Sequence, residues 1–207
     1  MESYSYHNLY TAAKQALRKV DGENAEFTAR EIVAAATDRS VSQLVADFPL
    51  TVFQRDIIRV NKMVERHLKG EPLAYILGQW EFYGLSLTVT QDVLIPRDDT
   101  EAVCDLAIHQ TMLSGQHPRV LDLCAGSGCI GLAVAARVKD ARVTLGEISP
   151  EAIRVAKKNV QDNHLSGRVS CIQLDVRQPA PKFLGKYDLI VSNPPYVTAR
   201  QMEELDT

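Results

Sequence analysis

The chain has 207 residues, of which 45% are hydrophobic and 24% are charged, and its formal net charge is −3. This length allows one domain with a sizeable core plus a small second domain, and the composition excludes a disordered chain. The nearly balanced charge also argues against broad electrostatic binding of nucleic acid.

Residues 1–75 are predicted to form a bundle of helices. Three short segments have the capping-box pattern, in which a serine or threonine precedes a glutamate or glutamine by three positions. These are Thr28 with Glu31, Ser40 with Gln43, and Thr51 with Gln54. After the third segment, apolar residues recur every three or four positions, which predicts one packed helix face. They are Phe53, Ile57, Val60, Val64 and Leu68. Gly70 and Pro72 then predict the end of this helix.

Residues 76–98 are predicted to form a linker that contains a β-hairpin. Aromatic residues precede a turn at Gly84, and apolar residues then alternate with polar ones, as in a half-buried strand. The aromatic residues are Trp80, Phe82 and Tyr83, and the alternating ones are Leu85, Leu87 and Val89. After Pro96, residues 99–113 are predicted to form a helix that leads into a second domain over residues 99–207.

From Arg119 onward, predicted strands alternate with predicted helices. The strands cover residues 120–123, 142–147, 169–174 and 187–192. One helix follows the first strand and ends near Val138. Another follows the second strand, with Ser149 as its cap and Pro150 at its first position. This alternation predicts an α/β domain in which a parallel sheet is covered on both faces.

Small residues form the turn after the first of these strands. They let the backbone approach a ligand, and the helix behind them presents free amide groups. The residues are Cys124, Ala125, Gly126, Ser127 and Gly128. Such a turn also occurs in phosphate-binding proteins and in tight connections that bind nothing. By itself it therefore predicts a binding loop without saying which ligand it holds.

Acidic residues end the next two strands. Glu147, about 20 residues after the glycines, can accept hydrogen bonds from both ribose hydroxyls of a nucleoside. Both nicotinamide cofactors and S-adenosylmethionine meet that requirement. Asp175 can accept a hydrogen bond from an adenine amino group while Val176 packs on the ring, or it can cap a turn.

The tetrapeptide Asn193-Pro194-Pro195-Tyr196 follows the fourth strand and decides between these cofactors. Hydride transfer has no use for it, whereas methylation of an amide or a ring amine does. The Asn193 side-chain oxygen and the Pro194 carbonyl can each accept one N–H of a substrate NH₂ group, which turns its lone pair toward the methyl group. Tyr196 would lie flat over the planar target. Alternatively, Asn-Pro-Pro only ends a strand.

Signals for membranes and metals are absent from the sequence. No apolar stretch approaches the roughly 20 residues of a membrane span, and the first residues lack the basic start and apolar core of a signal peptide. We therefore expect a cytoplasmic protein without membrane contact. The four cysteines form no C-x-x-C pair and the five histidines show no metal-ligand spacing, so we expect no metal.

These motifs resemble the PrmC/HemK family of class I S-adenosylmethionine-dependent methyltransferases. This family methylates N5 of the glutamine in the Gly-Gly-Gln motif of peptide chain release factors. Besides the tetrapeptide, residues 78–85 and 93–101 are similar to the family's linker signature. The resemblance implies a Rossmann-like domain behind an N-terminal domain that helps to engage the release factor. We expect a monomer that uses S-adenosylmethionine.

The resemblance also implies roles for single residues. The segment from Cys124 to Gly128 would line the methionine part of the cofactor, Glu147 would hold the ribose, and Asp175 with Val176 would border the adenine. Asn193 would touch both cofactor and substrate. The glutamine amide would lie between Asn193, the Pro194 carbonyl and Tyr196, with Pro195 shaping the wall.

The chain departs from the family pattern in three places. Cys124 stands where the family usually has glycine, which would strain the backbone by about 1 kcal/mol or more if φ is positive there. Asp98-Asp99 replaces a usual Pro-Glu. The family sheet has seven strands, and this chain reaches only the fourth, so the methyltransferase domain is expected to be incomplete, either as a fragment or by nature.

Two other functions fit parts of the sequence. An adenine-N6 methyltransferase of nucleic acid would share the tetrapeptide but not the linker segments, and the near-neutral charge, with no basic stripe beside the motif, argues against it. A module that binds cofactor or release factor without turnover would fit an incomplete domain.

Overall fold

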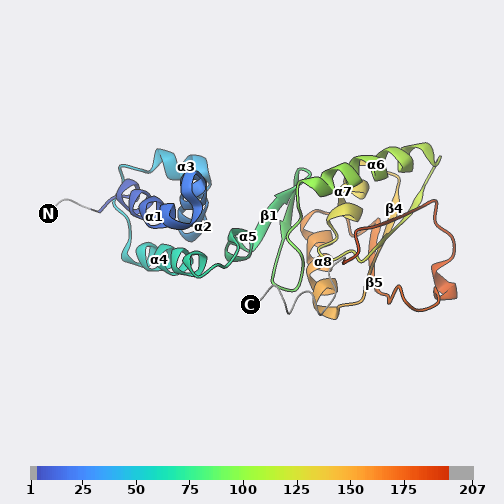
Figure 1. Cartoon of the computed structure of the whole chain (residues 1–207). Coiled ribbons are helices and arrows are strands. Elements are labelled where there is room, and N and C mark those ends of the chain that lie inside the picture. The colour runs from blue at the N-terminus through green and yellow to red at the C-terminus, as the bar shows by residue number, and fades with distance from the viewer. Residues whose placement is uncertain (1–3, 196–207) are drawn as a thin grey trace. The chain divides into compact units, whose positions relative to one another are not determined.

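The computed structural model describes residues 4–195, and the chain divides into two compact units, residues 1–78 and 79–207 (Figure 1). Each unit has a hydrophobic core of its own. None of the helices between residues 4 and 195 combines the length and the hydrophobicity that a bilayer span requires. We describe the units separately.

The first unit is helical, as predicted. Its helices are α1 (Tyr6–Asp21), the short 3₁₀ turn η1 (Gly22–Asn24), α2 (Ala25–Ala36), α3 (Val41–Ala46), α4 (Gln54–Leu68) and α5 (Leu73–Leu77). The core is made of residues such as Leu17, Ile32 and Val60, which are fully buried. It also encloses one polar pair, because the Tyr6 hydroxyl donates to the buried Asp56 carboxylate at 2.9 Å.

Only one of the three predicted capping boxes is present. Ser40 and Gln43 form the reciprocal bonds at the start of α3. Thr28 is wrong as a cap, because α2 already begins at Ala25 and the Thr28 hydroxyl donates to the Asn24 carbonyl inside the helix. The predicted cap at Thr51 is also wrong. Helix α4 begins at Gln54, and its N-cap residue Phe53 makes no side-chain bond. The backbone of Thr51 instead forms an isolated antiparallel β-bridge with Ser5.

Ser5 makes a further capping box that the sequence pattern missed. Its hydroxyl accepts from the Asn8 backbone N–H, and the Asn8 side chain accepts from the Ser5 backbone N–H. The usual pattern requires glutamate or glutamine at that third position. On α4, Val60 and Val64 are buried as predicted, whereas Phe53 and Leu68 at its two ends are 59% and 41% exposed.

The second unit opens with the predicted hairpin, β1 (Gln79–Phe82) and β2 (Leu85–Thr88), which pair antiparallel. Tyr83 and Gly84 join them, and both have positive φ angles of 52° and 75°. Two positive φ angles are the requirement of a type I′ hairpin turn. The hairpin packs on α8 (Pro150–Asp162) and is part of the second compact unit.

The remaining elements form a mixed α/β domain. They are α6 (Asp99–Leu113), β3 (Arg119–Leu123), α7 (Cys129–Arg137), β4 (Arg142–Glu147), α8, β5 (Val169–Gln173), the 3₁₀ turn η2 (Lys182–Leu184) and β6 (Leu189–Ser192). The strands run parallel in the order β5-β4-β3-β6, so their carboxyl ends meet at one edge. The order reverses at β3, and the crevice beside such a switch point is where open α/β sheets bind ligands.

Helices cover one face of this sheet. Side chains of α6, α7 and α8 share a core with Val120, Val143 and Val169, which are neighbours in register across β3, β4 and β5 (Figure 1). The opposite face carries the crossover between β5 and β6, which contains only η2 within the described residues, and Ile190 on β6 is 60% exposed. Within residues 4–195 no α-helix covers this face, but Leu121 on it is buried and Tyr187 of the crossover bonds to Thr144, so the predicted cover is partial there.

Candidate functional site

The loop after β3 turns sharply because three of its residues adopt left-handed backbone angles. Cys124, Gly126 and Gly128 have φ angles of 57°, 53° and 82°. A Cβ at Gly128 would lie 2.8 Å from a Leu145 methyl group, whereas a Cβ at Gly126 would meet nothing within 4 Å. Gly128 therefore lets the loop pack on the sheet. Gly126 leaves open space that a ligand can approach.

Cys124 occupies the position where the family pattern has glycine. Its positive φ is the condition under which a side chain costs about 1 kcal/mol or more in strain. Burial is the main cause that raises the pKa of its thiol, and a hydrogen bond with Ser192 opposes that change. The thiol is thus neutral at ordinary pH and presents a small uncharged side chain.

Glu147 at the end of β4 is held by three backbone amides. Its Oε2 atom accepts from Gly126 N–H at 2.9 Å, and its Oε1 atom accepts from Ile148 and Ser149 N–H at 2.8 and 3.1 Å. Each carboxylate oxygen has two lone pairs, so Oε1 is saturated and Oε2 keeps one. The carboxylate links the glycine loop to the start of α8 and still offers an acceptor.

Asp122 lies beneath this loop and is 1% exposed. Its Oδ2 atom accepts from Gly131 N–H at 2.9 Å, and its Oδ1 atom has no partner among the described residues. Burial, with a smaller contribution from the nearby negative charge of Glu147, raises the pKa of Asp122 to about 7, although the Gly131 bond opposes this. A protonated Asp122 at neutral pH would avoid an unpaired buried charge.

Asn193 lies beside this loop because β6 pairs with β3. Leu123 and Ser192 are neighbours in register, and the Ser192 hydroxyl donates to the Leu123 carbonyl at 2.8 Å. The residues that follow these strands, Cys124 and Asn193, therefore come together. Asn193 is half-buried, and Pro194 and Pro195 after it are exposed.

A pocket of about 460 Å³ joins these parts. Its size lies in the roughly 300–1,000 Å³ range of small-molecule sites. Six residues that the sequence singles out line it, namely Cys124, Gly126, Glu147, Asn193, Pro194 and Pro195. The lining also includes a segment to which the sequence assigned no site role, represented by Asp92, Leu94 and Arg97. Its similarity to the family's linker signature was the available signal.

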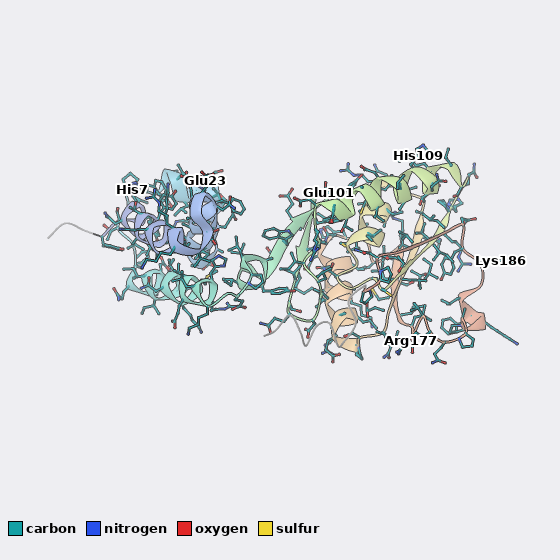
Figure 2. The ribbon with its side chains drawn as sticks, in the orientation of Figure 1. His7, Glu23, Glu101, His109, Arg177 and Lys186 are labelled. Carbon is teal, nitrogen blue, oxygen red and sulfur yellow. The ribbon has the colours of Figure 1, made fainter. Side chains whose placement is uncertain are left out.

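Other predicted site residues lie elsewhere. Asp175 forms an ion pair with Arg177, which Figure 2 labels, at 2.9 Å, and this pairing lowers the pKa of Asp175. Neither Asp175 nor Val176 lines the pocket. Ala125 and Ser127 are buried below the loop, and Gly128 is the N-cap of α7. Tyr196 lies outside the described residues.

No group of three or more histidine, cysteine, aspartate or glutamate side chains within residues 4–195 is placed to hold a metal ion.

A separate hollow lies at the amino ends of β3, β4 and β5, where Arg119, Arg142 and Arg168 line it. It contains none of the predicted site residues.

Comparisons with known families cover both units. Residues 8–78 match the PrmC N-terminal domain, and residues 105–205 match the methyltransferase small domain. Both units are thus similar to parts of PrmC-type methyltransferases. This confirms the predicted resemblance, and the match of the methyltransferase small domain together with the parallel sheet confirms the predicted fold class.

The curated relatives described below carry two names. A release factor glutamine methyltransferase from Geobacter sulfurreducens is 36% identical over 185 residues, which are 88% of this chain and 62% of that protein. One from Bordetella pertussis is 46% identical over 66% of this chain and 49% of that protein. A bifunctional methyltransferase from Rickettsia felis is 29% identical over 98% of this chain and 43% of that protein.

The chain thus spans about half the length of the curated relatives it matches. Among solved structures, the METTL16 methyltransferase domain is similar over 65% of the chain and 54% of that structure, with 22% identity and a TM-score of 0.48.

Proposed function

We propose that this chain binds S-adenosylmethionine in the pocket between Glu147 and Asn193. We further propose that it methylates N5 of the glutamine in the Gly-Gly-Gln motif of peptide chain release factors. The observation that carries the proposal is the shared pocket, because Glu147, Gly126, Asn193 and Pro194 all line it. Two relatives named release factor glutamine methyltransferase support the choice of substrate.

The residues present fit the cofactor. Oε2 of Glu147 keeps a lone pair that can accept from a ribose hydroxyl, and the open space at Gly126 allows close approach of the methionine part. Cys124 would border this part as an uncharged wall. Asp175 and Val176, proposed to border the adenine, lie outside the pocket lining and would have to approach the ring from the adjoining β5 end. When bound, S-adenosylmethionine supplies an electrophilic methyl group.

Asn193 and Pro194 would prepare the glutamine nitrogen. An amide nitrogen is a weak nucleophile, because its lone pair is delocalised into the carbonyl group. The Asn193 side-chain oxygen and the Pro194 carbonyl can accept its two N–H bonds, which orients the lone pair and favours the positive charge that develops on nitrogen. Proline has no N–H that could compete. Pro195 would shape the wall, and Tyr196 is proposed to cover the planar amide.

We also propose that residues 1–75 dock the release factor, that residues 76–98 serve as the linker, and that the protein is a cytoplasmic monomer. The match of residues 8–78 to the PrmC N-terminal domain supports the first role. On α4, the Arg55 side chain is exposed, and Ile58 beside the same surface is also exposed. Arg55→Glu should raise KM for a release factor without changing cofactor affinity. Light scattering gives the molar mass in solution and so tests whether the protein is a monomer.

The decisive experiment is transfer of labelled methyl groups from S-adenosylmethionine to a release factor, with the modified residue located by mass spectrometry. The chain should label the Gly-Gly-Gln glutamine, and Asn193→Ala should abolish labelling while it keeps most of the affinity for S-adenosylhomocysteine. Gln161→Ala, at an exposed site on α8 outside the pocket lining, is the matched control and should retain activity.

Equal transfer by Asn193→Ala and the parent would contradict the proposal. Labelling of adenine in DNA or RNA, with an untouched release factor, would instead identify a nucleic-acid methyltransferase. Cofactor binding without transfer to either substrate would favour a binding module.

A further inference from the structure

Arg97 lines the pocket, and its side chain has no partner within residues 4–195. It belongs to the segment between the hairpin and α6, and it lines the pocket together with Glu147 and Asn193. Its guanidinium makes no hydrogen bond, ion pair or ring contact within residues 4–195, whereas arginines such as Arg59 and Arg177 are paired with carboxylates. An arginine without a partner beside a small-molecule pocket is positioned to receive an anion.

The charged side chains of the pocket are one base and two acids. Arg97 is the one basic residue among the described residues that line it, and the acidic ones are Asp92 and Glu147. Glu147 is engaged by three backbone amides, and Asp92 accepts from the Thr90 hydroxyl at 3.0 Å. Neither acid forms an ion pair with Arg97 within residues 4–195, so the guanidinium keeps its hydrogen-bond donors for a ligand.

Arg97 and Asn193 line the same two spaces, so a ligand group bound by Arg97 would lie near Asn193. A smaller hollow of about 160 Å³ adjoins the pocket, and Leu94, Arg97 and Asn193 line both spaces. An anion held by Arg97 would thus be anchored close to the residue proposed to hold the reacting amide. The start of α6 at Asp99 also borders the smaller hollow.

We propose that Arg97 binds the α-carboxylate at the methionine end of S-adenosylmethionine and thereby positions the methyl group toward Asn193. This inference rests on the proposed function. The carboxylate is the single anionic group of the cofactor, and the glutamine amide and its glycine neighbours are neutral. The planar guanidinium matches a carboxylate with two parallel hydrogen bonds, which are about twice as strong as bonds between two neutral groups.

The test compares ligands that differ at this end of the molecule. S-adenosylhomocysteine keeps the amino-acid group, and 5′-methylthioadenosine lacks it. Arg97→Ala should weaken binding of the first by about 10- to 100-fold and leave the second within about twofold. Arg97→Lys keeps the positive charge but loses the planar group that makes two parallel hydrogen bonds. Its affinity for S-adenosylhomocysteine should lie between those of the parent and the alanine variant. Arg154→Ala, an exposed arginine on α8 outside the pocket, is the matched control.

A second ligand pair separates the carboxylate from the amine. Decarboxylated S-adenosylmethionine lacks only the carboxylate. The parent chain should bind it more weakly than S-adenosylmethionine, and Arg97→Ala should bind the two almost equally. If Arg97 contacts the carboxylate directly, the variant loses this discrimination between the two ligands. A general effect on folding would weaken both ligands and would leave the discrimination unchanged.

Four results would overturn the inference. Unchanged affinity for S-adenosylhomocysteine in Arg97→Ala would place the carboxylate elsewhere, and a raised KM for the release factor in that variant would make Arg97 a substrate residue. Equal weakening of both ligands would assign Arg97 to the adenosine side or to the fold. If the folded parent bound none of these ligands, the proposed function would fail and the inference with it.

Discussion

The Asn159 side chain donates a hydrogen bond to the Ser127 carbonyl at 2.9 Å and so supports the glycine loop from below. The same side chain donates to the Thr88 carbonyl at 3.0 Å and accepts from the Thr88 N–H at 2.7 Å. Asn159 is 0% exposed, and its side chain makes hydrogen bonds to the backbone of both the glycine loop and the hairpin. One residue of α8 therefore fixes the hairpin and the proposed cofactor loop in a common frame.

Asn159→Ala should destabilise the second unit by roughly 2–5 kcal/mol, because it removes the partner of the buried Ser127 carbonyl and of two partly buried backbone groups of Thr88. The single tryptophan, Trp80, lies on β1, so its fluorescence during urea unfolding reports on this unit. Gln161→Ala on the same helix should change stability by less than about 0.5 kcal/mol. A loss below about 1 kcal/mol in Asn159→Ala would show that water replaces these bonds.

Asp122 should make the stability of the second unit depend on pH. Its pKa rises from 3.8 to about 7 on folding, so the folded state binds the proton more tightly than the unfolded state. The resulting stabilisation is fully present below about pH 4 and is lost as the pH rises toward and past 7. Between pH 5 and 8, the parent should lose roughly 3 kcal/mol relative to Asp122→Asn.

Urea unfolding of both proteins at several pH values, followed through Trp80, measures this difference. Asparagine keeps an acceptor for the Gly131 N–H but cannot ionise, so titration of the other groups cancels in the comparison. Parallel pH profiles for the two proteins would mean that Asp122 is ionised in the folded protein and that its Oδ1 atom is solvated.

Cys124 tests the cost of a side chain in a left-handed backbone conformation. Cys124→Gly removes the strain and should be at least as stable as the parent, despite the greater freedom of glycine in the unfolded chain. Cys124→Val places a β-branched side chain at φ 57° and should be less stable than the parent by more than 1 kcal/mol. Calorimetric titration should give S-adenosylhomocysteine affinities in the same order. A valine variant equal to the parent would show that the loop readjusts at little cost.

The sequence predicted the regular elements of the second unit well, because caps and apolar periodicity mark them locally. The helix over residues 99–113 and the strand over residues 142–147 have the predicted bounds. The meeting of the β3 loop with Asn193 was also predictable, since carboxyl ends of parallel strands share one edge. In the structure, Leu123 and Ser192 at the ends of β3 and β6 pair in register, as this rule predicts.

What the sequence could not predict depends on tertiary contacts. The segment that carries Arg97 has no periodicity, and it reaches the pocket because the preceding hairpin packs on α8 through Thr88 and Asn159, 71 residues apart. The capping boxes failed for a different reason. A four-residue pattern recurs by chance, so Thr28 and Thr51 matched it, whereas the real cap at Ser5 uses an asparagine.

Glu147→Gln should weaken S-adenosylhomocysteine binding by about 10- to 100-fold, for two reasons that can be separated. The glutamine amide has one acceptor oxygen where the carboxylate has two, so its NH₂ group must face either the Gly126 N–H or the N–H groups of Ile148 and Ser149. This conflict loosens the loop for any ligand. The lost acceptor for the ribose affects only ligands that carry the hydroxyl.

A 3′-deoxy and a 2′-deoxy analogue of 5′-methylthioadenosine separate the two effects. If Glu147 accepts from one ribose hydroxyl through the free lone pair of Oε2, the parent should discriminate against one analogue more than the other, and Glu147→Gln should lose that discrimination. Glu151→Gln, at an exposed site in the first turn of α8, should bind every ligand as the parent does. If Glu147→Gln weakened all ligands equally, Glu147 would serve only to hold the loop, and the ribose would be bound by other residues.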